Sequence, residues 1–216
     1  MPASRVLGGR ADIGPLTIPI RSRNVQPGNP WMRSCAMTAF STGLHHIATQ
    51  SAFGWPAIAV AVGVGAYLNH QGASLKPPGI ICFELAFTTS NARRIVGGWA
   101  GSLDVAAKQV WCDYVFILGY VCSLLFICFH AADYASHRGH ADLASLAEFA
   151  GYGALLAGLL DGIENVGLLL MLAGRISTLI VLVTSLCATV KFVLAFAAIP
   201  VACAVAGRSW WSPAQT

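Results

Sequence analysis

Four long apolar stretches, separated by polar or proline- and glycine-containing segments, dominate the chain. They cover roughly residues 52–68, 110–132, 146–172 and 177–206. About 20 residues of helix cross the hydrocarbon core of a membrane. A chain of 216 residues is too short to bury several such helices inside a soluble core. The pattern therefore predicts an all-α fold, an integral membrane four-helix bundle.

The connections and the tryptophans support these boundaries. Residues 173–176 form so short a connection that the third and fourth helices should make an antiparallel hairpin. Tryptophan side chains favour the interface between membrane and water. Five of the six tryptophans fall at or near expected helix ends, namely Trp55, Trp99, Trp111, Trp210 and Trp211.

The longest connection contains one further expected helix. Its sequence "FELAFTTSNARRIVGGW" places Phe83, Phe87 and Ile95 roughly in helical phase, with Arg93 and Arg94 off that face. An amphipathic segment of this kind lies in the plane of the membrane surface, with its apolar side toward the lipid. We expect a short interfacial helix here.

The first 36 residues form a polar segment that contains five arginines and one acid. They include no apolar core of a secretory signal, so three interpretations remain: an unstructured tail, an organelle transit peptide, or an over-extended start with Met37 as the first residue.

We expect a membrane domain over 37–209 and a short tail over 210–216. Basic residues favour the cytoplasmic side, so the full tail weakly places both termini inside, and a start at Met37 reverses the orientation.

Composition narrows the class of protein. Only 10% of the residues are charged and the mean hydropathy is +0.66, against roughly 25% charged residues in a soluble domain. The basic residues behind the net charge of +4 lie mainly in the tail and one loop, without interleaved stacking aromatics. We expect no nucleic acid partner. The expected partner is the lipid bilayer and the expected location is multi-pass, in a bacterial inner membrane.

Three polar residues interrupt the third apolar stretch, "LLAGLLDGIENVGLLLML" over 155–172. Residues three and four apart share one face of a helix, so Asp161, Glu164 and Asn165 form one cluster. Small residues (Ala154, Ala157, Gly158) precede them on that face. The cluster should therefore face another helix.

The fourth stretch contains a single lysine, Lys191, near its midpoint. A lone lysine there costs about 2.5–3.5 kcal/mol on insertion scales and needs a partner. Counted from the hairpin at 1.5 Å per residue, Asp161 lies roughly 18 Å deep and Lys191 roughly 21 Å. We predict an Asp161–Lys191 pair, which could serve only to fix the register of two helices.

Further acids are expected on the long-loop side of this pair. Asp113 and Tyr120 are seven residues apart on the second stretch and share a face. Glu84, on the interfacial segment, lies on the same side of the membrane. With Glu164 and Asp161, these acids could form a descending line of carboxylates that ends at Lys191.

Four acids against one lysine leave excess negative charge, so either some acids are protonated or a cation is bound. Three functions follow. The first is a membrane-embedded enzyme that acts on a lipid or isoprenoid phosphate with Mg²⁺, an ion that prefers oxygen ligands. The second is a small proton- or ion-coupled carrier, which would need to form a homo-oligomer. The third is a non-catalytic membrane subunit or assembly factor. For the enzyme, the candidate catalytic residues are Asp161, Glu164, Lys191 and Asp113. The candidate ligand-binding residues are Glu84, Asn165, Tyr120, Arg93 and Arg94. The candidate metal ligands are Asp161, Glu164 and Asp113.

Overall fold

A computed structural model describes residues 41–211, and the side chains of residues 41–208. The expected tail over 1–36 and residues 212–216 lie outside the described part. A short helix over 41–48 is followed by six more. Their bounds are α2 (Ser51–Gly72), α3 (Ile80–Glu84), α4 (Thr89–Gly98), α5 (Leu103–His137), α6 (Ala141–Leu172) and α7 (Thr178–Trp211).

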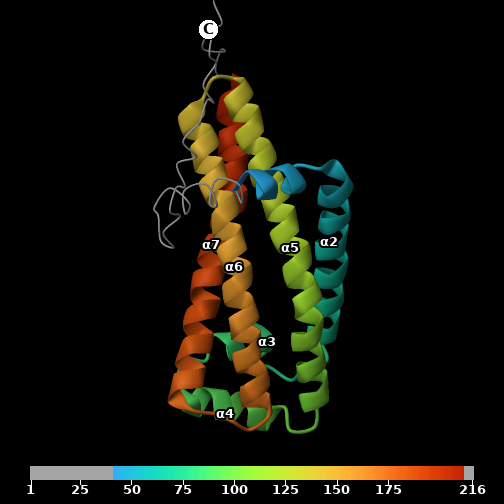
Figure 1. Cartoon of the computed structure of the whole chain (residues 1–216). Coiled ribbons are helices and arrows are strands. Elements are labelled where there is room, and N and C mark those ends of the chain that lie inside the picture. The colour runs from blue at the N-terminus through green and yellow to red at the C-terminus, as the bar shows by residue number, and fades with distance from the viewer. Residues whose placement is uncertain (1–40, 212–216) are drawn as a thin grey trace, which may run out of the picture. The chain divides into compact units, whose positions relative to one another are not determined.

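The four long helices run antiparallel to their neighbours in sequence (Figure 1). Helix α5 contacts α2, α6 and α7, whereas α2 packs mainly against α5. All four are long and apolar enough to cross a membrane, as the sequence predicts. The connection between α6 and α7 is tight, and Gly174 adopts a positive φ of 84° there, a conformation that glycine adopts without steric cost.

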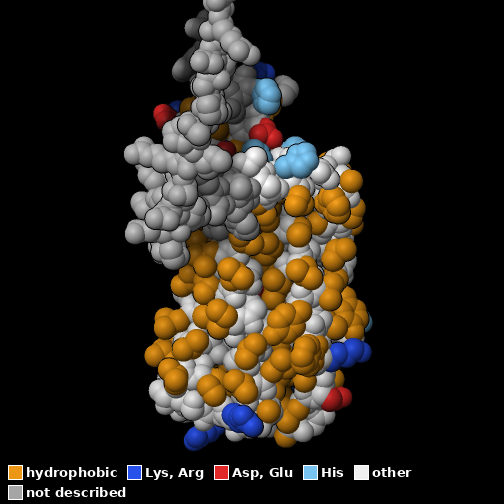
Figure 2. All heavy atoms as spheres, in the orientation of Figure 1, with side chains coloured by type: hydrophobic (Ala, Val, Ile, Leu, Met, Phe, Trp, Pro, Cys, Tyr) orange, Lys and Arg blue, Asp and Glu red, His pale blue; other side chains and the backbone are white. Residues whose placement is uncertain are grey.

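The lateral surface of the bundle is apolar. Hydrophobic side chains cover most of the lateral face below the grey atoms in Figure 2, and lysine or arginine side chains are visible at its lower end. Large side chains such as Phe149, Leu179 and Phe196 are more than 70% exposed. In water such a surface would be strongly unfavourable, so it fits a protein surrounded by lipid.

Small residues bring the helices close together. The stripe Ala154, Ala157 and Gly158 on α6 is fully buried, as expected. A Cβ atom on Gly158 would overlap Val121 of α5, and one on Gly167 would overlap Thr184 of α7. Close approach at small residues is the usual way in which membrane helices pack.

In the long connection the structure has two short helices, α3 and α4, where the sequence predicts one. The chain turns between them, where Phe87 has a positive φ of 53° and is 45% exposed. Thr88 caps α4 by accepting a hydrogen bond from the Asn91 backbone N–H. The expected common face of Phe83, Phe87 and Ile95 therefore excludes Phe87, while the other two are buried.

This connection folds into the end of the bundle. Phe83 and Trp99 are at most 1% exposed, and their rings meet edge to face at 5.3 Å. The Trp99 indole N–H donates to the Lys76 carbonyl oxygen at 2.8 Å. Trp99 is thus a core residue, unlike Trp55 and Trp111, which are exposed at expected interfacial positions. Helix α4 crosses the lower ends of α6 and α7 in Figure 1, and α3 is positioned above it, also in contact with α6 and α7.

Candidate functional site

Lys191 lies at the centre of a buried charge cluster. Its Nζ is 2.6 Å from Asp161 Oδ1 and 2.9 Å from Glu164 Oε2, both on α6. The predicted Asp161–Lys191 pair is confirmed. Glu164 lies three residues, or nearly one turn, beyond Asp161 on α6, and the Lys191 ammonium reaches both acids. All three residues are at most 6% exposed.

Glu84 brings a third carboxylate to the cluster from α3. Its Oε2 is 3.5 Å from Lys191 Nζ. Glu84 lies outside the four candidate spans, and burial raises its pKa while the Lys191 ammonium opposes that shift. Placement of α3 depends on the buried Phe83 next to Glu84 and on a hydrogen bond from the Phe87 backbone N–H to Ser185 Oγ of α7 at 3.0 Å. The connection that was expected at the membrane surface therefore supplies part of the buried site.

Two residues of α5 complete the polar network. The Tyr120 hydroxyl donates to Asp161 Oδ2 at 3.0 Å. Asn165 Nδ2 donates to Asp113 Oδ2 at 2.8 Å. The expected shared face of Asp113 and Tyr120 thus meets α6. The carboxylates do not form a line, however: three surround Lys191, and Asp113 is paired with Asn165.

The two acids of α6 differ in how well their oxygens are satisfied. Asp161 interacts with Lys191 through one oxygen and with Tyr120 through the other. Glu164 is completely buried; its Oε2 lies 2.9 Å from the Lys191 ammonium, and its Oε1 has no hydrogen-bond partner. Ionised groups buried without hydrogen bonds are costly. Fully ionised, the three carboxylates around the one ammonium would leave a net charge of −2.

A cavity of about 610 Å³ adjoins this cluster, between α2, α3, α5 and α6. Its polar lining side chains are Glu84, Gln109, Asp113, Asn165 and the exposed Asn69, and its other lining residues are mostly apolar. Glu84 therefore belongs to both the cavity and the Lys191 cluster. The cavity lies at the end of the bundle where α2 and α3 connect.

The residues expected to bind phosphate and metal are arranged differently. Arg93 and Arg94 are exposed on α4 and do not line this cavity, and Arg94 donates to Asn91 Oδ1 at 3.4 Å. Over residues 41–211, no three His, Cys, Asp or Glu side chains are grouped so that they could hold a metal ion. Asp161 and Glu164 face the Lys191 ammonium, whereas Asp113 is hydrogen-bonded to Asn165.

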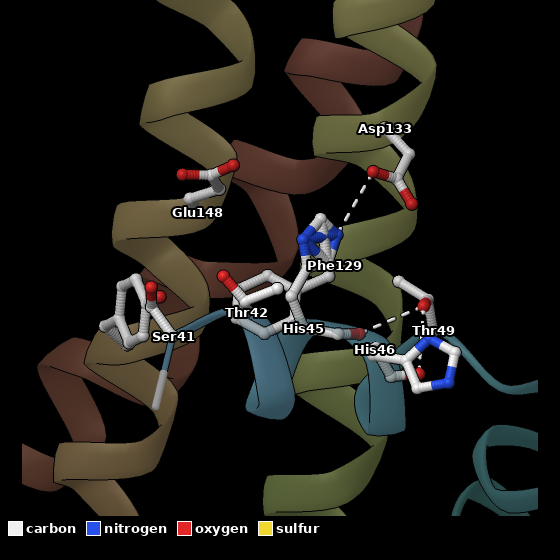
Figure 3. Close-up of a pocket in the computed structure, with 9 residues that line it drawn as sticks. Ser41, Thr42, His45, His46, Thr49, Phe129, Asp133 and Glu148 are labelled. Atoms are coloured by element: carbon white, nitrogen blue, oxygen red, sulfur yellow. Dashed lines mark hydrogen bonds and ion pairs between the residues drawn. The ribbon is translucent and has the colours of Figure 1, made fainter. Parts of the chain in front are cut away.

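A second cavity, of about 430 Å³, lies near the opposite ends of α5 and α6. Figure 3 shows His45 facing Asp133 of α5, with Glu148 of α6 beside the same space. The His45 Nε2 to Asp133 Oδ1 distance is 3.1 Å. Sequence reasoning missed this pair, because nothing in the sequence places the helix over 41–48 against α5. Between the two cavities, the small residues Ala154, Ala157 and Gly158 of α6 are buried.

The fold and the site together define a multi-pass membrane protein with a buried lysine surrounded by three acids. No family model, curated protein or solved structure matches the chain. Its function must therefore be argued from the site itself.

Proposed function

We propose that this protein is a small proton-coupled carrier, in which Glu164 binds and releases the coupling proton. The observation that supports this most directly is the environment of Glu164: it is completely buried, it shares the single Lys191 ammonium with Asp161 and Glu84, and its Oε1 has no hydrogen-bond donor. In such a place the neutral carboxyl form avoids the cost of an unsatisfied buried charge. Buried acids and lysines across a bundle are typical of proton relays in transport proteins.

The positions of the two cavities also favour transport. Asp113 lines one cavity and Asp133 lines the other. Twenty residues of α5 separate them, which corresponds to roughly 30 Å along the helix. Alternating access requires one central site that opens to each side in turn. In this conformation the cluster adjoins the cavity near α3, while packed small residues separate it from the other. A proton gradient, such as that across a bacterial inner membrane, would drive the cycle.

The alternative of a lipid-phosphate enzyme fits the site less well. The charged residues that line the cavity beside the cluster are both acids, Glu84 and Asp113, and carboxylates repel a phosphate group. The two arginines suited to binding phosphate lie elsewhere on α4. A purely structural cluster is the remaining alternative, and it differs from the carrier because its protons need not exchange.

Infrared spectroscopy of the protein in lipid nanodiscs tests the role of Glu164. We expect a protonated carboxyl band that shifts in D2O and that grows as the pH is lowered. The Glu164→Gln variant should lose this band, because the amide cannot carry the carboxyl proton.

Glu148→Gln is the matched control, since Glu148 lies on the same helix but outside the cluster, and it should keep the band. A band that persists in Glu164→Gln would assign the proton to another acid and contradict the proposed role. A band that is insensitive to pH, or absent, would instead indicate a cluster that only sets helix pairing.

A further inference from the structure

Four buried or half-buried polar side chains line the 610 Å³ cavity, namely Glu84, Gln109, Asp113 and Asn165, and the exposed Asn69 also contributes to its lining. The rest of its lining includes Leu68, Ile80, Val110 and Leu168. Sites for small organic ligands have this composition, in which apolar walls enclose the body of the ligand and a few polar groups fix its orientation. The size also falls within the usual range of about 300–1,000 Å³ for such sites.

The polar wall is rich in hydrogen-bond acceptors. Gln109 is only 5% exposed; its Nε2 donates to the Leu68 carbonyl oxygen at 3.1 Å, and its Oε1 has no partner. Asn165 donates one amide N–H to Asp113. The acceptors on this wall include the Gln109 amide oxygen and the carboxyl groups of Glu84 and Asp113. Buried acceptors without donors are rare in folded proteins and call for an explanation.

We propose that this cavity binds a small organic cation with an apolar body, such as an aryl or alkyl ammonium ion. Its positive charge would be placed against Asp113 and Glu84, and its apolar part against the aliphatic wall. A hydrated inorganic cation would leave that wall unused, and the described side chains offer no three-ligand metal site. A phosphate or carboxylate ligand would face two acids.

The site is connected to the proton cluster through Glu84, and this step rests on the proposed carrier function. Glu84 lines the cavity and its Oε2 is 3.5 Å from Lys191 Nζ. A cation beside Glu84 stabilises the ionised forms of nearby acids. Binding of the cation should therefore release a proton from the cluster, and by linkage proton binding should weaken the affinity for the cation. Exchange of a proton for a cation across the membrane follows from this competition.

Calorimetric titration of the full chain in nanodiscs tests the site with three matched probes. These are benzylammonium, its neutral isostere ethylbenzene, and the anion phenylphosphonate. We expect the cation to bind most tightly, and titrations in two buffers of different ionisation enthalpy should show that it releases protons. Asp113→Asn should weaken cation binding by about tenfold or more, the effect of losing one contact with a charged group.

Asp104→Asn is the control, because Asp104 is an exposed acid in the first turn of the same helix. It should bind the cation as the unaltered protein does, and thermal unfolding of both variants shows whether they remain folded. Equal binding of the neutral isostere, preferred binding of phenylphosphonate, or no binding of the cation would overturn the cation site even if the Glu164 infrared band is present. Cation binding without proton release would support the site and contradict the coupling, and hence the proposed carrier.

Discussion

Replacing Lys191 by methionine is expected to lower the free energy of unfolding by roughly 3–5 kcal/mol at neutral pH, the usual cost of removing one partner from a buried ion pair. The cost should be at the upper end, because three acids lose their counter-charge at once. It should shrink as the pH is lowered, because the stranded acids then take up protons. Unfolding of the variant in detergent, followed across a pH series, measures both effects.

Two comparisons separate this effect from a general sensitivity to mutation. Lys108→Met makes the same change at an exposed lysine of α5 and should alter stability little. Adding Asp161→Leu to Lys191→Met should restore only part of the loss, since Glu84 and Glu164 remain without a cation. Full restoration by that one addition would mean that the site is a simple pair and that the other two acids matter little.

The membrane bundle itself could be predicted from the sequence, because helices that cross the lipid must be apolar over about 20 residues. The helices extend beyond the apolar stretches, however. Helix α5 begins at Leu103 and α6 at Ala141, several residues before the expected starts near 110 and 146. Polar residues such as Asp104 and Lys108 end the apolar pattern without ending the helix, because hydrogen bonding within the backbone continues through them.

The Asp161–Lys191 contact could be predicted because a tight hairpin fixes the relative heights of α6 and α7. Rotation about each helix axis is not fixed in this way. The partners of Tyr120 and Asp113 on α6 therefore became definite only in the folded structure.

The contribution of Glu84 depends on tertiary packing. The sequence predicts that the apolar side of residues 83–99 faces lipid. In the structure it packs against α6 and α7 around Phe83 and Trp99. An amphipathic pattern cannot distinguish a lipid surface from the end of a bundle, since both bury apolar side chains. The short segment Leu85–Thr88 between α3 and α4 allows the chain to enter the bundle at this point.

Replacing Gly167 by leucine is expected to lower the free energy of unfolding by about 1–3 kcal/mol, the usual cost of overfilling a packed interior. Even a single Cβ at this position would overlap the Thr184 side chain, so the larger residue should force α6 and α7 apart. Gly162→Leu is the matched control on the same helix, because no atom lies within 4 Å of a Cβ built there. Thermal unfolding of the two variants measures the difference.

The same substitution should also disturb the charge cluster. Glu164 precedes Gly167 by one turn of α6, and Thr184 precedes Lys191 by two turns of α7, so separation of the helices at this contact should lengthen the Glu164–Lys191 distance. The protonated carboxyl band assigned to Glu164 should then change in Gly167→Leu and remain in Gly162→Leu. Adding Thr184→Ala should recover part of both stability and band, because it removes the overlapping hydroxyl group. A destabilised Gly167→Leu protein with an unaltered band would show that the cluster is held by α3 and α5 and not by the close contact of α6 with α7.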